Sequence, residues 1–195
     1  HARLKLSQTL LRSLLAHGPT ADEQSVKSGE LAIDIGRGIA SIARAYRGLG
    51  TLGRGERIYA IQGNRSAHLS LKKLDPHFFH ELHRAYKKRT IIIDGIIGER
   101  SLQLVRQMSD ADLRSHHGRA VVTVVLPDEY LDFDEDIVVY KDTMLLVNFS
   151  QELVVTIRNA LMVEAMRTLI RLFQDTGKKI DLNAYIAEEL VRRNQ

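Results

Sequence analysis

The chain has 195 residues, of which 44% are apolar and 27% are charged, a composition typical of one ordinary globular domain with room for an extra helix. It contains no cysteine, which excludes disulfides, thiolate zinc sites and cysteine nucleophiles and favours a cytoplasmic location. The net charge of +4 permits an anionic partner without requiring one. No apolar run approaches the roughly 20 residues that cross a bilayer, so no membrane contact is expected.

The N-terminal segment is expected to be a short helix. LKLSQTLLRSLLAH places leucines along one helical stripe, Gly18-Pro19 ends it, and a polar linker follows. Because the chain starts with His1-Ala2 and not with methionine, we expect the native protein to be longer. We divide the chain into an N-terminal helix with its linker (1–28), which is a candidate dimerisation element, an α/β domain (29–178) and a C-terminal helix (179–195).

The middle of the chain alternates helices and strands. Helices are predicted at 37–47, at 66–89 with a break where Asp75 caps a new helix at Pro76, and at 99–107. Between them, RIYAIQG, TIIIDGII and AVVTVVLP are predicted strands, and residues 109–118 form a polar loop or a short turn of helix.

Three further strands are predicted near 137–140, 143–149 and 153–157. The long helix that follows, 159–175, is expected to bury Leu161, Ala165, Leu169, Leu172 and Phe173, and an amphipathic helix covers 182–193. This order predicts the α/β class, with a mixed β-sheet flanked by helices, parallel strands at its centre and antiparallel pairs toward one side.

Few short motifs point to chemistry. Gly48, Gly50 and Gly53 spell G-x-G-x-x-G, but they follow a helix and precede a strand, the reverse of a dinucleotide-binding loop. Neither a P-loop nor the G-x-S-x-G of a hydrolase is present, so no cofactor is expected. His77 and His80 could share a metal ion from one helix, although a polar helix face is the better interpretation and no metal is expected.

The C-terminal half resembles a known family. LPDEYLDFDEDIVVYKDTMLLVNFSQELVVTIRNALMVEAMRTLIRLFQ is similar to the effector domain of TrmB-like transcription regulators, and the upstream order of elements is similar over roughly residues 30–178. Members of that family often carry a glycine where Lys141 stands. The resemblance implies a phospholipase D-like half-fold, a homodimer, and DNA contact only through a winged-helix domain that this chain lacks.

Phospholipase D chemistry requires H-x-K-x-x-x-x-D, with the aspartate at a turn between two strands. If the last position of the motif is Lys141, its first two are Asp134 and Asp136; a shift by one residue gives Glu135, Ile137 and Asp142. Neither register supplies the histidine and lysine, and a carboxylate would repel a phosphodiester. The resemblance therefore implies a non-catalytic relative.

We expect a ligand-sensing and dimerisation domain of a transcription regulator that has no enzymatic activity. In open α/β sheets, ligands bind beyond the carboxyl ends of the strands, and the polar groups predicted there would suit a sugar or an anionic metabolite. The candidate contacts are Gln62, Asn64, Arg65, Asp94, Glu99 and Arg100. Two alternatives stay open: a divergent phosphodiesterase, nuclease or metal-dependent hydrolase, and a protein-interaction scaffold without a small ligand.

Overall fold

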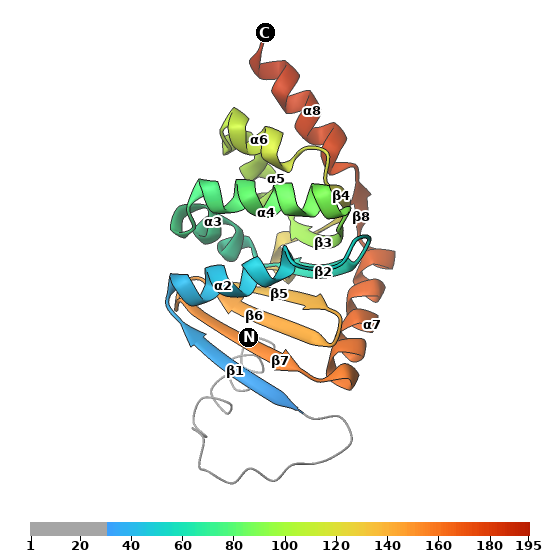
Figure 1. Ribbon diagram of the computed structural model, residues 1–195. Coiled ribbons are helices and arrows are strands. Elements are labelled where there is room, and N and C mark those ends of the chain that lie inside the picture. Colours follow the sequence, from blue (N-terminus) through green and yellow to red (C-terminus); the bar gives the residue numbers. More distant parts are fainter. Residues whose placement is uncertain (1–30) are drawn as a thin grey trace. The chain divides into compact units, whose positions relative to one another are not determined.

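A computed structural model describes residues 31–195, which form one compact unit. The helix and linker expected at 1–28 lie outside the described residues. Within 31–195 a mixed sheet has the strand order β1-β7-β6-β5-β2-β3-β4-β8 (Figure 1). Its strands are β1 (Ala32–Arg37), β2 (Arg57–Gln62), β3 (Ile92–Gly98), β4 (Ala120–Leu126), β5 (Glu135–Tyr140), β6 (Thr143–Asn148), β7 (Leu153–Arg158) and β8 (Lys178–Ile180).

Parallel strands occupy the middle of the sheet. β3 pairs with β2 and β4 in parallel, whereas β5, β6, β7 and β1 continue from β2 as antiparallel neighbours and β8 is an antiparallel edge beside β4. The predicted α/β class and the predicted mixture of strand directions are confirmed.

The helices lie on both faces of the sheet. They are α2 (Ile39–Leu49), α3 (Asn64–Lys73), α4 (Pro76–Arg89), α5 (Glu99–Leu104), α6 (Asp110–His116), α7 (Ala160–Thr176) and α8 (Leu182–Arg193), with 3-10 turns at Val105–Gln107 and Asp128–Tyr130. Arg167 and Arg171 of α7 lie over the ring of Tyr59 in β2. Ile58, the residue before Tyr59, packs in the core with α2 and α4. Because successive side chains of a strand point to opposite faces, α7 covers the face of the sheet away from those two helices.

Local signals place several boundaries. Asp75 accepts a hydrogen bond from the backbone N–H of His77 at 2.8 Å, so it caps α4 as predicted, and Pro76 is the first residue of that helix. The β5–β6 hairpin turns at Lys141-Asp142. Lys141 has a φ of 47°, the left-handed region that favours glycine, which accounts for the glycine expected there in similar proteins.

The structure corrects three expectations. β1 and β8 are edge strands that were not predicted: β1 follows the segment interpreted as a polar linker, and β8 has only 3 residues. The long helix α7 buries Val163 and Ile170, whereas Leu161, Leu169, Leu172 and Phe173 are exposed, so the predicted buried stripe is wrong.

The C-terminal residues belong to the same compact unit. Ile186 of α8 packs with Val105 and Leu113 in a small apolar cluster, and β8 pairs with β4 across Thr123–Val125. Residues 179–195 therefore pack on the α/β domain as part of the same unit. No helix of residues 31–195 is long and apolar enough to cross a membrane.

Candidate functional site

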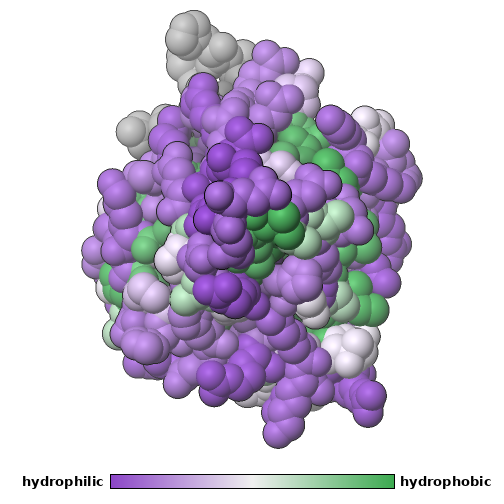
Figure 2. Space-filling model, turned by 90° about the horizontal axis from the view of Figure 1, so that it is seen from above, coloured by the Kyte–Doolittle hydropathy of each residue, from purple (hydrophilic) through white to green (hydrophobic). Residues whose placement is uncertain are grey.

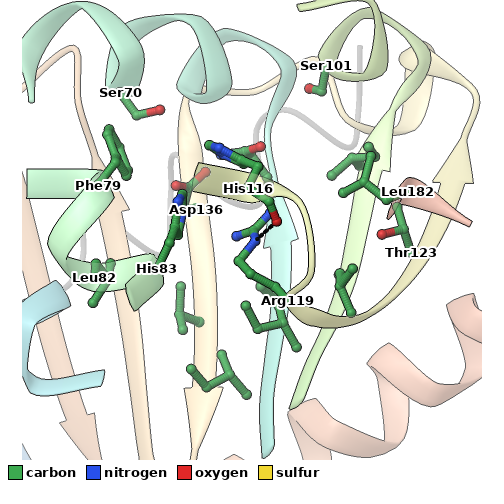
Figure 3. Close-up of a pocket in the computed structure, with 18 of the residues that line it drawn as sticks. Ser70, Phe79, Leu82, His83, Ser101, His116, Arg119, Thr123, Asp136 and Leu182 are labelled. Carbon is green, nitrogen blue, oxygen red and sulfur yellow. Dashed lines mark hydrogen bonds between the residues drawn. The ribbon is translucent and has the colours of Figure 1, made fainter. Parts of the chain in front are cut away.

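A cavity of about 230 Å³ lies between the centre of the sheet and the helices that cover it (Figure 3). Ala60 of β2, Gly95 of β3 and Val121 of β4 form part of its floor, and Phe79 and Leu82 of α4 form part of its wall. Gly95 contributes to the open space, since a Cβ built on it would meet no heavy atom closer than 4.0 Å. A glycine inside a strand often marks a place where a ligand approaches the backbone closely.

Arg119 supplies a positive charge to this mostly apolar cavity. The side chain extends from the loop between α6 and β4, and its Nε donates to the carbonyl oxygen of His116 at 3.0 Å. Among residues 31–195, no carboxylate lies within ion-pair distance of its guanidinium. Burial lowers the pKa of Arg119 to about 10, so the group stays protonated at neutral pH. A half-buried cation without a carboxylate partner attracts an anion.

Two neutral histidines stand beside this arginine. The rings of His83 and His116 meet edge to face with their centroids 4.1 Å apart. Burial lowers the pKa of His116 to about 3, and burial lowers that of His83 further. The Nδ1 of His116 lies 3.1 Å from the carbonyl oxygen of Asp112, so we assign the proton to Nδ1 and leave Nε2 as an acceptor.

Asp136 of β5 is a buried carboxyl group on the same cavity. The hydroxyl of Tyr46 donates to its Oδ2 at 2.7 Å. Burial raises the pKa of Asp136 to about 6, although Ser66, Tyr46 and Gln62 favour the charged form and limit the rise. The cavity therefore combines a fixed cation, two neutral imidazoles and one carboxyl group that titrates near neutrality.

Only one of the predicted ligand residues lines this cavity. Gln62 does so from the end of β2. Asn64, Arg65 and Arg100 lie at the carboxyl ends of β2 and β3, as expected, but their side chains bind the acidic segment that follows β4. Asn64 Nδ2 donates to Asp128 Oδ1 at 3.0 Å, Arg100 Nε lies 3.3 Å from Asp128 Oδ2, and Arg65 pairs with Asp132 and Asp134.

The remaining predicted residues lie apart from the cavity. Glu99 is the exposed first residue of α5. Asp94 forms an ion pair with Arg57 at 2.6 Å and does not line the cavity, to which its neighbours Ile93 and Gly95 contribute. The ligand role of these residues stays a prediction, and intramolecular partners already occupy four of them: Asn64, Arg65, Asp94 and Arg100.

The histidines considered for a metal are not gathered into a metal site. His80 Nε2 lies 2.8 Å from Asp112 Oδ1, and His77 is exposed. Within the part of the chain that the structure describes, no three His, Cys, Asp or Glu side chains are grouped to hold a metal ion.

The hairpin compared with the phospholipase D motif contributes to the cavity through Asp136. Asp134, two residues earlier, instead accepts from Arg65 and from Ser150 Oγ. Arg119, His83 and His116 were not among the predicted site residues: the H-x-x-H-x-x-H spacing that includes His83 was interpreted as a polar helix face, and His116-His117 as part of a loop. The available signal was Gly95, which together with Asp94 interrupts the apolar run of β3.

Comparisons with known proteins address the fold. No family model matches the sequence, and no curated protein matches it significantly. The archaeal chromatin protein TrmBL2, reported to show a novel mode of DNA binding, has a similar structure with a TM-score of 0.53 and 12% identity. The match covers 92% of this chain and 64% of TrmBL2, so the chain spans less than two thirds of that protein.

Nuc from Salmonella typhimurium, a phospholipase D family member, is similar with a TM-score of 0.52 and 14% identity. That match covers 77% of this chain and 99% of Nuc. At these identities the comparisons show the fold alone. The chain has a mixed α/β fold similar to that of Nuc and of the TrmB-like protein TrmBL2, which confirms at the level of fold the resemblance expected from the sequence.

Proposed function

We propose that this chain is the ligand-sensing domain of a cytoplasmic, homodimeric transcription regulator, and that its effector binds in the cavity around Arg119. The fold similarity to TrmBL2 supports the regulator class, and we assign DNA contact to a winged-helix segment of the whole protein, outside residues 31–195. The observation that carries the proposal is the guanidinium of Arg119, which faces an apolar cavity without a carboxylate partner among the described residues.

The cavity favours a small organic anion over a sugar. A sugar needs hydrogen-bond partners around its whole ring, whereas Ile58, Leu82 and Val121 make much of this lining apolar. A carboxylate or phosphate group would pair with Arg119, and the acceptor nitrogen of His116 would take a hydrogen bond from a hydroxyl of the ligand. An anionic metabolite with an apolar body fits both kinds of surface.

The enzymatic alternative has less support. A phosphodiesterase of this fold would need its nucleophile and its cation in the β5–β6 hairpin, where the chain has Asp134 and Asp136. Neither residue is the histidine nucleophile or the lysine cation that phospholipase D chemistry uses. A binding function uses the cavity without requiring a nucleophile.

Titration calorimetry on the full chain tests the site with a panel of short aliphatic and aromatic carboxylates and phosphorylated metabolites. For the anion that binds, Arg119→Met is expected to weaken affinity about 10–100-fold, the value of a hydrogen bond to a charged group. Gly95→Val should weaken binding, because its side chain projects into the cavity from a position where a Cβ meets no heavy atom closer than 4.0 Å.

Arg100→Met is the matched control, since it removes an equally long cation from the set predicted at the carboxyl ends of the strands. It should leave affinity unchanged. Binding that survives Arg119→Met and Gly95→Val but is lost in Arg100→Met would move the site to the ends of β2 and β3. Failure of every ligand to bind would refute the sensing function.

A further inference from the structure

Helix α7 has an exposed apolar face that the described residues leave uncovered. We name it the α7 face and define it by Leu161, Met162, Ala165, Leu169, Leu172 and Phe173. The side chain of Leu161 is 77% exposed and that of Leu172 is 57% exposed, and the other large members are more than 40% exposed. Seen from above, a largely hydrophilic surface has several separate hydrophobic patches, some of them toward the right, the side on which Figure 1 draws α7 (Figure 2).

The spacing of this face is that of a helix pair. Met162, Ala165, Leu169 and Leu172 follow one another in steps of three, four and three residues, the a and d positions of a heptad. Leu161 and Phe173 widen the seam at its two ends. Apolar residues at these positions are expected to pack against another helix, because exposed apolar patches of this kind mark interaction surfaces.

The face is symmetric about Arg167, and this symmetry identifies the partner. Ala165 and Leu169 lie two residues to either side of it, Met162 and Leu172 five, and Leu161 and Phe173 six. An antiparallel copy of the same helix, related by a two-fold axis, would thus set each member against an apolar member of the other copy. Small Ala165 would face large Leu169, as packing in a close helix pair requires.

The charges of α7 are already paired away from this face. Glu164 contacts Arg167 at 3.3 Å and Arg171 at 3.5 Å, and both arginines lie over Tyr59 on the side of the helix toward the sheet. None of the six members of the α7 face is charged. Two copies can therefore pack together without burying an unpaired charge, whose desolvation would oppose association.

We infer that the α7 face binds the α7 face of a second copy of this chain, with the two helices antiparallel about a two-fold axis at Arg167. This interface places dimerisation on the described domain, independently of the leucine-rich segment at the N-terminus. It is also independent of the proposed effector site, because α7 covers the opposite face of the sheet from the cavity.

Analytical ultracentrifugation of the full chain at micromolar concentrations tests the interface. Wild type is expected to sediment as a dimer, and Leu172→Glu should weaken the dimer at least about 30-fold, because it places a carboxylate without a partner in the seam. Val191→Glu is the matched control. Val191 is 59% exposed on α8, outside the face, and its variant should remain dimeric. Circular dichroism verifies that both variants are folded.

Cysteine cross-linking tests the relative orientation of the two helices. The chain has no native cysteine, so only the introduced cysteines can form a disulfide. A mixture of Ala165→Cys and Leu169→Cys chains should form a disulfide-linked dimer, whereas either variant alone should not. In the antiparallel pair, two cysteines at 165 are offset by four residues, about 6 Å along the axis before the lateral separation is added. Efficient cross-linking of Ala165→Cys alone would indicate a parallel pair and overturn the proposed geometry.

Two other results would overturn the interface itself. One is a dimer that Leu172→Glu leaves intact. The other is a wild-type chain that sediments as a monomer. If Leu172→Glu then also increased protease cleavage within residues 1–30, we would conclude that the α7 face binds the N-terminal segment of the same chain.

Discussion

The ionisation of Asp136 depends on the fold. The residue is 5% exposed, and burial raises the pKa of its carboxyl group from 3.8 to about 6. A carboxyl group with a raised pKa binds its proton more tightly in the folded state than in the unfolded state. Its stabilising contribution is therefore complete below about pH 4 and is lost as the pH rises through about 6.

Asp136→Asn should stabilise the protein more at high pH than at low pH. Asparagine cannot ionise and still accepts the hydrogen bond from Tyr46, so its advantage over wild type should grow by about 2 kcal/mol between pH 4.5 and pH 7.5. Urea unfolding of both proteins across this range measures the difference. A difference in unfolding free energy that is independent of pH would contradict the raised pKa.

Among the secondary-structure elements, strand β3 contains two glycines with opposite structural roles. Gly98 ends the strand where it touches the start of α3, and a Cβ built there would lie 2.0 Å from Asn64 Oδ1. Asn64 cannot easily move, because its side chain is held by Asp128 and by the hydroxyl of Ser101. Gly95, three residues earlier, faces the open cavity.

Gly98→Ala should therefore lower the free energy of unfolding by about 2 kcal/mol or more, as overpacking does. Gly95→Ala in the same strand should be neutral or should raise it by about 0.5–1 kcal/mol, since it restricts the unfolded chain without a clash. Chemical unfolding of the two variants provides the test. Equal effects at both positions would show that close approach at Gly98 is not what restricts that site.

At the scale of the whole molecule, the buried histidines make folding sensitive to acid. His83 and His116 are neutral in the folded state and bind protons when the chain unfolds. Their contribution to stability is complete above the ordinary histidine pKa of 6.5 and is lost as the pH falls toward 3. Between about pH 6 and pH 4, protonation of Asp136 stabilises the folded state and offsets part of this loss. Asp136 is a single group, however, whereas two histidines contribute to the loss.

His116→Gln should flatten the acid limb of the stability profile. Between pH 6.5 and pH 4.5, the variant should lose about 2–3 kcal/mol less than wild type, because one proton fewer is taken up on unfolding. His77→Gln, which alters an exposed histidine of α4, is the control and should keep the wild-type slope. Unfolding midpoints measured along the pH series decide between the two outcomes.

Much of the fold could be predicted because its signals are local. The apolar runs of β2 to β7, the cap at Asp75 and the break at Pro76 depend on neighbours in the sequence, and the class and strand directions followed from their order. Edge strand β8 was missed because three residues are too few to show a hydrophobic period. In β1, Ile33 and Ile35 alternate with Asp34, so that strand carried a local signal that the prediction missed. For α7, periodicity identified the apolar stripe but not the environment it faces.

The site shows where prediction from sequence ended. The sequence by itself determined that polar groups gather at the carboxyl ends of β2 and β3, and it placed Gln62, Asn64 and Arg100 there. Only the tertiary structure decided that the side chains of Asn64 and Arg100 bind Asp128. It also decided that Arg119, His116 and Asp136 line one cavity. The physical reason is that a pairing between charges distant in the chain, and the burial that shifts their pKa values, exist only after the sheet and its helices have packed.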